Sequence, residues 1–251
     1  MTATTPIPEV DLEFDNGSFD SVAFAAETLA SWQALAAVID HTLLKPEATR
    51  AQVESLCDEA LSYRFACAMV NPVWASTAVG VLSGSTVPVG AVIGFPLGAS
   101  LVSTLRHEAT ALIRLGVREL DMVIPIGFLK SGNYVAVQHT IQSVAKVAHG
   151  HGALLKVILE TALLNVAEKL RASEVAIQAG ADFIKTSTGF ASGGATAADV
   201  ALMRGVAGAR CGVKASGGIR TLADVKALLE SGANRIGASA SVAIVRELGA
   251  K

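Results

Sequence analysis

Hydrophobic and polar positions follow two different periodicities along the chain. Beginning at residue 38, short runs rich in Val, Ile and Leu are separated by longer segments in which apolar residues recur at helical spacing. The predicted strands are 38–44, 66–71, 87–96, 119–125, 154–160, 182–188, 211–217 and 234–239. Nearly continuous apolar strands that alternate with helices indicate a parallel sheet with both faces covered.

The number of repeats decides between two α/β folds. Eight predicted strands, each followed by a predicted helix, are what a closed (β/α)8 TIM barrel needs, and this is the fold that we expect. An open, doubly wound sheet is the alternative. It is disfavoured because no G-x-G-x-x-G motif follows the first strand, where a dinucleotide-binding fold would carry it.

The start of the chain differs from the rest in charge. Residues 1–30 contain Asp and Glu but neither Lys nor Arg, and they show no sustained periodicity. We therefore expect an acidic, flexible N-terminal extension over 1–30 and a single barrel domain over 31–251. A short helix is expected where the extension leads into the domain.

Composition excludes several classes of protein. With 51% hydrophobic and 17% charged residues, the chain can bury a large core and is not a disordered protein. A net charge of −2 and the lack of a basic, aromatic-rich cluster give no drive toward nucleic acid. No apolar run is long enough for a membrane span, and the first residues lack the basic region of a secretory signal. A cytoplasmic location is expected.

The cysteines and histidines show no metal-binding spacing. Cys57, Cys67 and Cys211 form no C-x-x-C pair, and there is no H-E-x-x-H motif. His149 and His151 stand two residues apart at a predicted helix end, which is typical of a solvated pair. We expect reduced thiols, no metal and no other cofactor.

Charged residues interrupt several of the predicted strands. Asp40, Asp121, Lys185 and Lys214 all lie in strands whose two faces should both be buried. A buried charge is costly unless it is paired. One interpretation is therefore a structural network of ion pairs inside the barrel.

The second interpretation is catalytic. A lysine amine is a nucleophile only when it is neutral, so its usual pKa of about 10.4 must fall by several units. Burial contributes to this fall, and a second ammonium close by is expected to contribute more. Lys185 and Lys214, on neighbouring strands, form such a pair, and Asp121 is placed to position water and relay protons. This pattern is typical of Schiff-base chemistry that makes or breaks carbon–carbon bonds.

Small and polar residues follow the later strands. They are Gly189, Gly217, Gly218, Arg220 and Ser239. Barrel enzymes often bind phosphate with the loops after strands seven and eight, where glycine lets backbone N–H groups approach an anion. Tight strand-to-helix turns are the alternative explanation. Two adjacent loops of this kind favour phosphate.

Six segments carry a resemblance to a known family. They are IDHTLLKPEAT at 39–49, DMVIPIGFLKSGNY at 121–134, KVILET at 156–161, FIKTSTGF at 183–190, GGAT at 193–196 and VKASGGIR at 213–220. In these segments the chain resembles the deoxyribose-phosphate aldolases, which are class I aldolases. The similarity runs from about residue 36 to 248, and the combination of K-T-S-T-G with K-A-S-G-G-I-R is specific to that family.

The resemblance implies a role for each matching residue. Lys185 matches the Schiff-base lysine, Lys214 the lysine that lowers its pKa, and Asp121 the aspartate of the proton relay. The other matching positions are Asp40, which helps to hold the lysines, Thr188, near the substrate hydroxyls, and Gly189, Gly217, Gly218, Gly237 and Ser239, which bind phosphate. The implied reaction is the reversible, metal-independent cleavage of 2-deoxy-D-ribose 5-phosphate to acetaldehyde and D-glyceraldehyde 3-phosphate.

Three positions depart from the family pattern. Met69 stands where a cysteine linked to inactivation by aldehydes is frequent, so better tolerance of acetaldehyde is expected. Ala240 stands where a serine often follows Ser239, and we predict weaker phosphate discrimination from the lost hydroxyl. Phe190 stands where part of the family has lysine, so no cationic contact is expected there. The expected ligands are small phosphorylated sugars and aldehydes, with neither nucleic acid nor membrane as a partner. A homodimer is among the assemblies open to the chain.

Three other functions stay open at this point. A sugar-phosphate isomerase would share the barrel and the phosphate site, but it would use a carboxylate or histidine base and has no need of paired lysines. A barrel that only binds a ligand would have no need of the two lysines together. A different class I aldolase would share the lysine chemistry and differ in its substrate.

Overall fold

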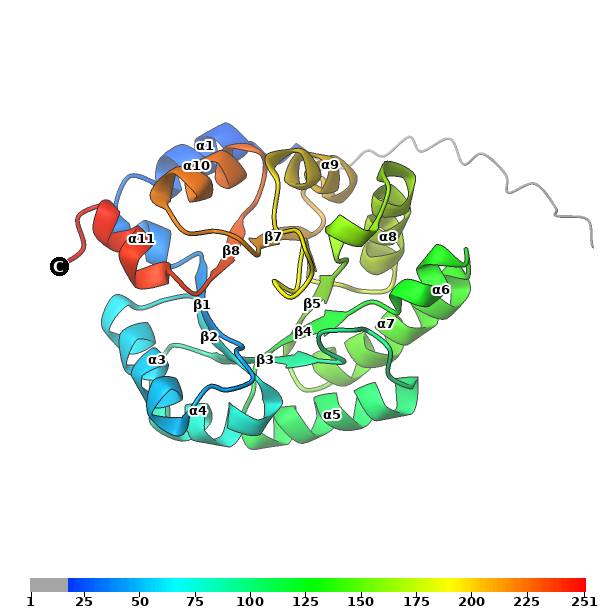
Figure 1. Cartoon of the computed structure of the whole chain (residues 1–251), viewed down its shortest axis with the longest axis horizontal. Helices are drawn as coiled ribbons and strands as arrows, with labels where there is room; N and C mark the ends of the chain where they lie inside the picture. The colour runs from blue at the N-terminus through cyan, green and yellow to red at the C-terminus, as the bar shows by residue number, and fades with distance from the viewer. Residues whose placement is uncertain (1–17) are drawn as a thin grey trace, which may run out of the picture.

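The chain forms a closed parallel barrel in the computed structural model, which describes residues 18–251. Eight strands lie side by side in chain order, and β8 pairs with β1 to close the ring (Figure 1). The strands are β1 (Ile39–Leu43), β2 (Cys67–Val70), β3 (Val89–Ile93), β4 (Glu119–Val123), β5 (Leu154–Ile158), β6 (Phe183–Lys185), β7 (Gly212–Ser216) and β8 (Arg235–Ala238). The predicted (β/α)8 barrel is confirmed.

Helices surround the barrel, one main helix after each strand (Figure 1). They are α3 (Arg50–Tyr63), α4 (Ala75–Val81), α5 (Val102–Leu115), α7 (Tyr134–His149), α8 (Val166–Gln178), α9 (Ala197–Ala207), α10 (Leu222–Glu230) and α11 (Ser241–Glu247). Short segments precede three of them: η1 (Pro72–Trp74), α6 (Ile126–Lys130) and η2 (Thr161–Leu163). None of the helices in residues 18–251 is both long and apolar enough to cross a membrane.

Local sequence determines where several helices begin. Thr49 starts α3 with a capping box, in which its side chain and that of Gln52 each accept the other residue's backbone N–H. Thr221 and Asp224 repeat this arrangement at α10. Each box satisfies backbone donors that have no partner within the helix.

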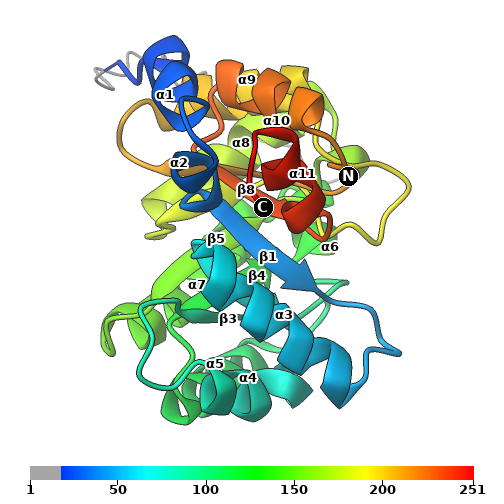
Figure 2. The same cartoon turned by 90° about the vertical axis from the view of Figure 1, so that its left-hand side faces the viewer.

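Two further helices precede the barrel. The first, α1 (Ser21–Thr28), begins at Asp20 and packs against α10, while α2 (Trp32–Ala36) packs against α11 (Figure 2). The predicted extension over 1–30 therefore contains an ordered helix in its second half. Its residues 1–17 lie outside the described part of the chain. The boundary between extension and barrel domain stays a prediction.

The two faces of the strands bury different kinds of side chain. Leu120, Met122 and their counterparts on other strands pack under the helices in the main hydrophobic core. The alternate positions of β4 to β8 and β1 point into the barrel and carry the charges, with Asp121 paired in register with Lys156 and Lys185 with Lys214. Because strand residues alternate between faces, this register brings charges from far apart in the sequence into one place.

Candidate active site

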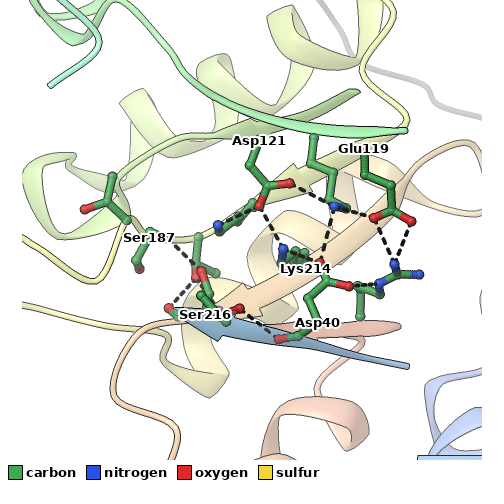
Figure 3. A network of polar contacts seen from close by, with 12 residues as sticks. Asp40, Glu119, Asp121, Ser187, Lys214 and Ser216 are labelled. Atoms are coloured by element: carbon green, nitrogen blue, oxygen red, sulfur yellow. Dashed lines mark hydrogen bonds and ion pairs between the residues drawn. The ribbon is translucent and has the colours of Figure 1, made fainter. Parts of the chain in front are cut away.

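Two lysines and one aspartate form the centre of the site. Lys185 Nζ donates to Asp121 Oδ2 at 2.7 Å, and Lys214 Nζ donates to the same oxygen at 2.8 Å. Lys214 also contacts Asp40 Oδ2 (Figure 3). All four side chains are at most 3% exposed. The structure therefore brings together the four residues that the sequence analysis proposed as catalytic.

Three more charged residues complete the network below this centre. Lys156 Nζ lies 2.6 Å from Glu119 Oε2 and 2.8 Å from Asp121 Oδ1. Arg235 donates to Asp40 Oδ1 at 2.6 Å and to Glu119 at 2.9 Å. No role was expected for Lys156, Glu119 or Arg235 from the sequence, although all three are charged residues in predicted strands and this was a signal of it.

The network has one basic group more than it has acids. The basic side chains are Lys156, Lys185, Lys214 and Arg235, and the carboxylates are Asp40, Glu119 and Asp121. Four positive and three negative charges would leave a surplus of one in the dry interior of the barrel. The loss of one proton from a basic group makes the charges equal.

The basic groups differ in how strongly they hold their protons. Burial alone would lower the pKa of Lys156, but Asp121, Asp40 and Glu119 raise it well above its usual value. Arg235, beside Asp40 and Glu119, is shifted in the same direction, so its pKa also rises. Both groups therefore stay charged, and they are not the source of a neutral amine.

The pKa of Lys185 is shifted in the opposite direction. The pKa of its ammonium is lowered to about 8: burial is the largest cause, Asp121 opposes it, and Lys214 contributes a smaller lowering. Burial is thus the larger cause and the second ammonium the smaller. The order expected from the sequence, in which the second ammonium contributes more, is wrong, because the completeness with which the barrel excludes water from Lys185 depends on tertiary packing.

The aspartates remain ionised among these cations. Burial alone would raise the pKa of Asp121, but Lys156, Lys185 and Lys214 hold it well below its usual range. The same balance lowers the pKa of Asp40, which faces Lys156, Lys214 and Arg235. A carboxylate that stays charged beside Lys185 can hold a water molecule or a reacting hydroxyl group in place.

A cavity of about 360 Å³ opens above Lys185 at the carboxyl ends of the strands. Its walls are the loops after β1, β6, β7 and β8. Ser216 Oγ donates to the carbonyl oxygen of Ser187 at 2.6 Å and so ties two of these loops together (Figure 3). This is the end of the barrel where TIM-barrel enzymes bind their substrates.

Comparison with known proteins identifies the family. Residues 34–247 match the model of the DeoC/LacD family aldolases. The chain belongs to this aldolase family. Deoxyribose-phosphate aldolase of Lysinibacillus sphaericus is 53% identical over 216 residues, which are 86% of this chain and 96% of the relative. The enzyme of the same name from Halalkalibacterium halodurans is 54% identical over 214 residues, 85% of this chain and 95% of the relative.

A solved structure has the same fold. Deoxyribose-phosphate aldolase from Aeropyrum pernix, described as a tetramer, superposes with a TM-score of 0.84 at 35% identity, covering 91% of this chain and 96% of that one. The resemblance stated from the sequence motifs is therefore confirmed. In this aldolase the network and the cavity occupy the place where the family motifs converge.

Most of the predicted substrate-binding positions line the cavity of the aldolase. They are Thr188, Gly189, Gly217, Gly218, Gly237 and Ser239. Arg220 is not among the lining residues. Its side chain is exposed, and its backbone N–H donates to Asp224 Oδ2 at the start of α10. Arg220 thus belongs to the cap of α10 and not to the part of the loop that lines the cavity.

Lys45 and Phe190 also line the cavity. Lys45 follows β1 and was missed by the sequence analysis, because nothing in its local sequence distinguishes it from a solvated lysine. Lys45 and Lys185 are the charged side chains of the lining, and both are basic. Phe190 packs edge-on against Phe95 at 5.2 Å between ring centroids. The cavity therefore offers basic side chains at two places and apolar surface at a third.

Glycine is required where the loops after β6 and β7 meet. A Cβ at Gly194 would lie only 2.2 Å from the carbonyl oxygen of Gly217. Gly217 itself has a φ of +88°, a conformation that strains other residues. Side chains at these positions would push the two loops apart and open the wall of the cavity.

Asp40, Cys67 and Glu119 have potential ligand atoms within 4.8 Å of one another. Lys156 and Arg235 already bind both carboxylates, however. Burial raises the pKa of the Cys67 thiol well above its usual value, which disfavours the thiolate that a metal needs. This cluster of the aldolase is a poor fit for a metal ion.

Proposed function

We propose that the chain is a class I aldolase that reversibly cleaves 2-deoxy-D-ribose 5-phosphate to acetaldehyde and D-glyceraldehyde 3-phosphate, without a metal or organic cofactor. The observation that carries this proposal is Lys185, a buried amine with its pKa lowered to about 8, at the floor of the cavity. The relatives named deoxyribose-phosphate aldolase support the choice of substrate.

In the proposed mechanism, the neutral Lys185 amine attacks the aldehyde carbon of the open-chain sugar. Loss of water gives a protonated Schiff base, which is an electron sink. A water held by Asp121 takes the proton from the C3 hydroxyl, the C2–C3 bond breaks, and its electron pair forms an enamine on Lys185. D-Glyceraldehyde 3-phosphate leaves with C3 as its aldehyde carbon. Protonation of the enamine at C2 and hydrolysis of the resulting Schiff base release acetaldehyde and regenerate the amine.

The surrounding charges suit this sequence of steps. When the neutral Lys185 amine becomes a protonated Schiff base, a positive charge forms on its nitrogen. The Asp121 carboxylate lies beside this nitrogen and stabilises the charge. Lys214 is held between Asp40 and Asp121. It is placed to exchange a proton with Asp121, the carboxylate that Lys185 also contacts. We propose Lys185 as the nucleophile, with Asp121 and Lys214 as the proton relay and Asp40 as the residue that holds Lys214.

We propose that the phosphate group binds at the rim of the cavity, near Gly189, Gly217, Gly218, Gly237 and Ser239. These are lining residues with small side chains, which leave the backbone open to an anion. Lys45, in place of Arg220, is the proposed basic side chain. It lies in the same lining as these residues, and the substrate carries a phosphate at the end away from its aldehyde.

The experiment is product analysis with 2-deoxy-D-ribose 5-phosphate in the presence of a metal chelator. NMR should detect acetaldehyde and D-glyceraldehyde 3-phosphate in equal amounts. Lys185→Leu should lose at least about 1,000-fold in kcat, because the covalent step is lost. The matched control is Lys226→Leu on the exposed face of α10, which should keep wild-type activity. An isomerised sugar phosphate without acetaldehyde would indicate a sugar-phosphate isomerase instead.

The cytoplasmic location and the homodimer stay predictions.

A further inference from the structure

Glu160 is a buried acid that the mechanism above does not use. It follows β5, is only 2% exposed and has a φ of 58°, which is uncommon for a residue other than glycine. Its carboxylate does not join the lysine network in the barrel. It reaches the loop after β6 and accepts hydrogen bonds from the backbone N–H of Thr188, at 3.3 and 3.4 Å, and from the Thr188 hydroxyl. The unusual backbone conformation of Glu160 thus accompanies a buried carboxylate that points at Thr188 in the cavity wall.

These contacts determine what the Thr188 hydroxyl can offer to a ligand. A hydroxyl group has one proton to donate and two lone pairs that accept. The proton of Thr188 goes to Glu160, and one lone pair accepts the backbone N–H of Phe190 at 3.0 Å. The remaining lone pair is the one position left. Thr188 is 7% exposed and lines the same cavity as Lys185, so this lone pair is available to a ligand in the cavity.

We propose that Glu160 is a positioning residue that makes Thr188 an obligate hydrogen-bond acceptor, so that the cavity selects substrates with a hydroxyl group next to the reacting carbon. The inference rests on the proposed aldolase function. In the cleavage direction the selected group is the C4 hydroxyl of the sugar phosphate. In the synthetic direction it is the 2-hydroxyl of the acceptor aldehyde.

The chemistry of the reaction favours the C4 hydroxyl over the C3 hydroxyl. The C3 oxygen loses its proton during cleavage and becomes a carbonyl oxygen, which is only an acceptor. Opposite the free lone pair of Thr188 it would face a second acceptor, an unfavourable contact that would grow as the bond breaks. The C4 hydroxyl keeps its proton throughout the reaction and can donate to Thr188 at every step.

The experiment compares two acceptor aldehydes with acetaldehyde as the donor: D-glyceraldehyde 3-phosphate and 3-oxopropyl phosphate, which lacks the 2-hydroxyl. The wild-type protein should prefer the hydroxylated acceptor by at least about tenfold in kcat/KM. Glu160→Gln should lower the ratio severalfold, because the Thr188 hydroxyl then loses the charged acceptor that fixes its proton and its free lone pair is no longer held toward the cavity. Thr188→Val should also lose the preference, and Thr188→Ser should keep it.

Glu174→Gln is the matched control, since Glu174 is a buried acid of α8 that pairs with Arg171 away from the cavity. It should keep the wild-type ratio, which a merely structural effect of losing a buried acid would change. Glu160→Gln with an unchanged ratio overturns the inference, and so does a wild-type ratio near one. If Glu160→Gln does not fold, Thr188→Val decides, and an unchanged ratio there overturns it.

Borohydride trapping with acetaldehyde separates this inference from the proposed function. Wild-type protein that forms the Lys185 adduct but does not distinguish the two acceptors overturns the role of Glu160 and Thr188 alone. Wild-type protein that forms no adduct overturns the aldolase proposal, and the inference about its acceptor falls with it.

Discussion

The floor and the rim of the cavity are formed by different kinds of chemical group. The floor is a network of buried side chains from β1, β4, β5, β6, β7 and β8, in which each carboxylate contacts at least two basic groups. The rim consists mainly of loop backbone and small residues, with the exposed Lys45. Shifting the pKa of an amine requires exclusion of water and fixed neighbouring charges, which only the floor provides. Holding a phosphate needs open backbone donors, which the rim provides.

This difference predicts two classes of mutational effect. Changes in the floor should alter the chemistry and the stability together, because each ion there depends on its partners. Changes at the rim should alter the preference for phosphorylated substrates and leave the amine chemistry intact.

The largest effect is expected from Asp121→Asn. It removes the carboxylate shared by Lys156, Lys185 and Lys214 and leaves their charges without this partner. We expect about 3–5 kcal/mol lower free energy of unfolding and a kcat lower by about 100-fold or more. Chemical denaturation and the steady-state rate measure both. Asp58→Asn on the exposed face of α3 is the control. Full stability in Asp121→Asn would show that the floor does not depend on this ion.

A smaller effect in the floor is expected from Lys214→Met. Lys214 lowers the pKa of Lys185, so its removal should raise that pKa above about 8, by roughly one unit. A basic group with a higher pKa is protonated over a wider pH range, so activity near pH 7 should fall. It should recover only in part as the pH rises, because the proton relay through Lys214 is lost as well. The pH profile of kcat/KM measures this shift. A profile that keeps the wild-type midpoint would remove Lys214 from the account of Lys185.

At the rim, Lys45→Met should raise KM for 2-deoxy-D-ribose 5-phosphate by about fivefold, which corresponds to the loss of one exposed ion pair of about 1 kcal/mol. With unphosphorylated 2-deoxyribose the variant should match the wild-type protein. Lys226→Met on α10 serves as the control lysine. An equal loss with both sugars would mean that Lys45 acts on the fold of the loop and does not contact phosphate.

The smallest effect is expected from Ala240→Ser. The new hydroxyl follows Ser239 at the rim and adds one hydrogen-bond donor near the proposed phosphate site. The preference for the phosphorylated over the free sugar should rise by about two- to fivefold. Competition between the two sugars measures it. No change in preference would show that the family's second serine does not act through its hydroxyl in this chain.

The centre of the site could be predicted from the sequence because strands alternate with a period of two. Once the strands and their closure were expected, the charges in the first strand and in the fourth to eighth strands implied that these side chains meet in the barrel. Asp40 and Lys214 are 174 residues apart, yet their contact follows from this rule. The short strand β6 was predicted too long, since its last predicted residues form the loop that carries Thr188.

Other parts of the site were not predictable because they depend on loop conformation. Arg220 is exposed and its backbone N–H belongs to the cap of α10, and Glu160 reaches Thr188 from a backbone with an unusual φ. Arg235 spans from β8 to Glu119 across the barrel, a distance that local sequence does not determine. Pattern gives the face on which a residue lies, whereas tertiary packing decides which partner it meets.

The most direct test is the pH dependence of Schiff-base formation at Lys185. Wild-type protein would be mixed with acetaldehyde at a series of pH values, trapped with borohydride after a fixed short time, and digested for mass mapping. The account predicts an ethyl group on the peptide carrying Lys185, with a rate that rises as the amine loses its proton and levels off above a midpoint of about 8. A midpoint near the ordinary lysine value of 10.5, or an adduct on another lysine, would contradict it.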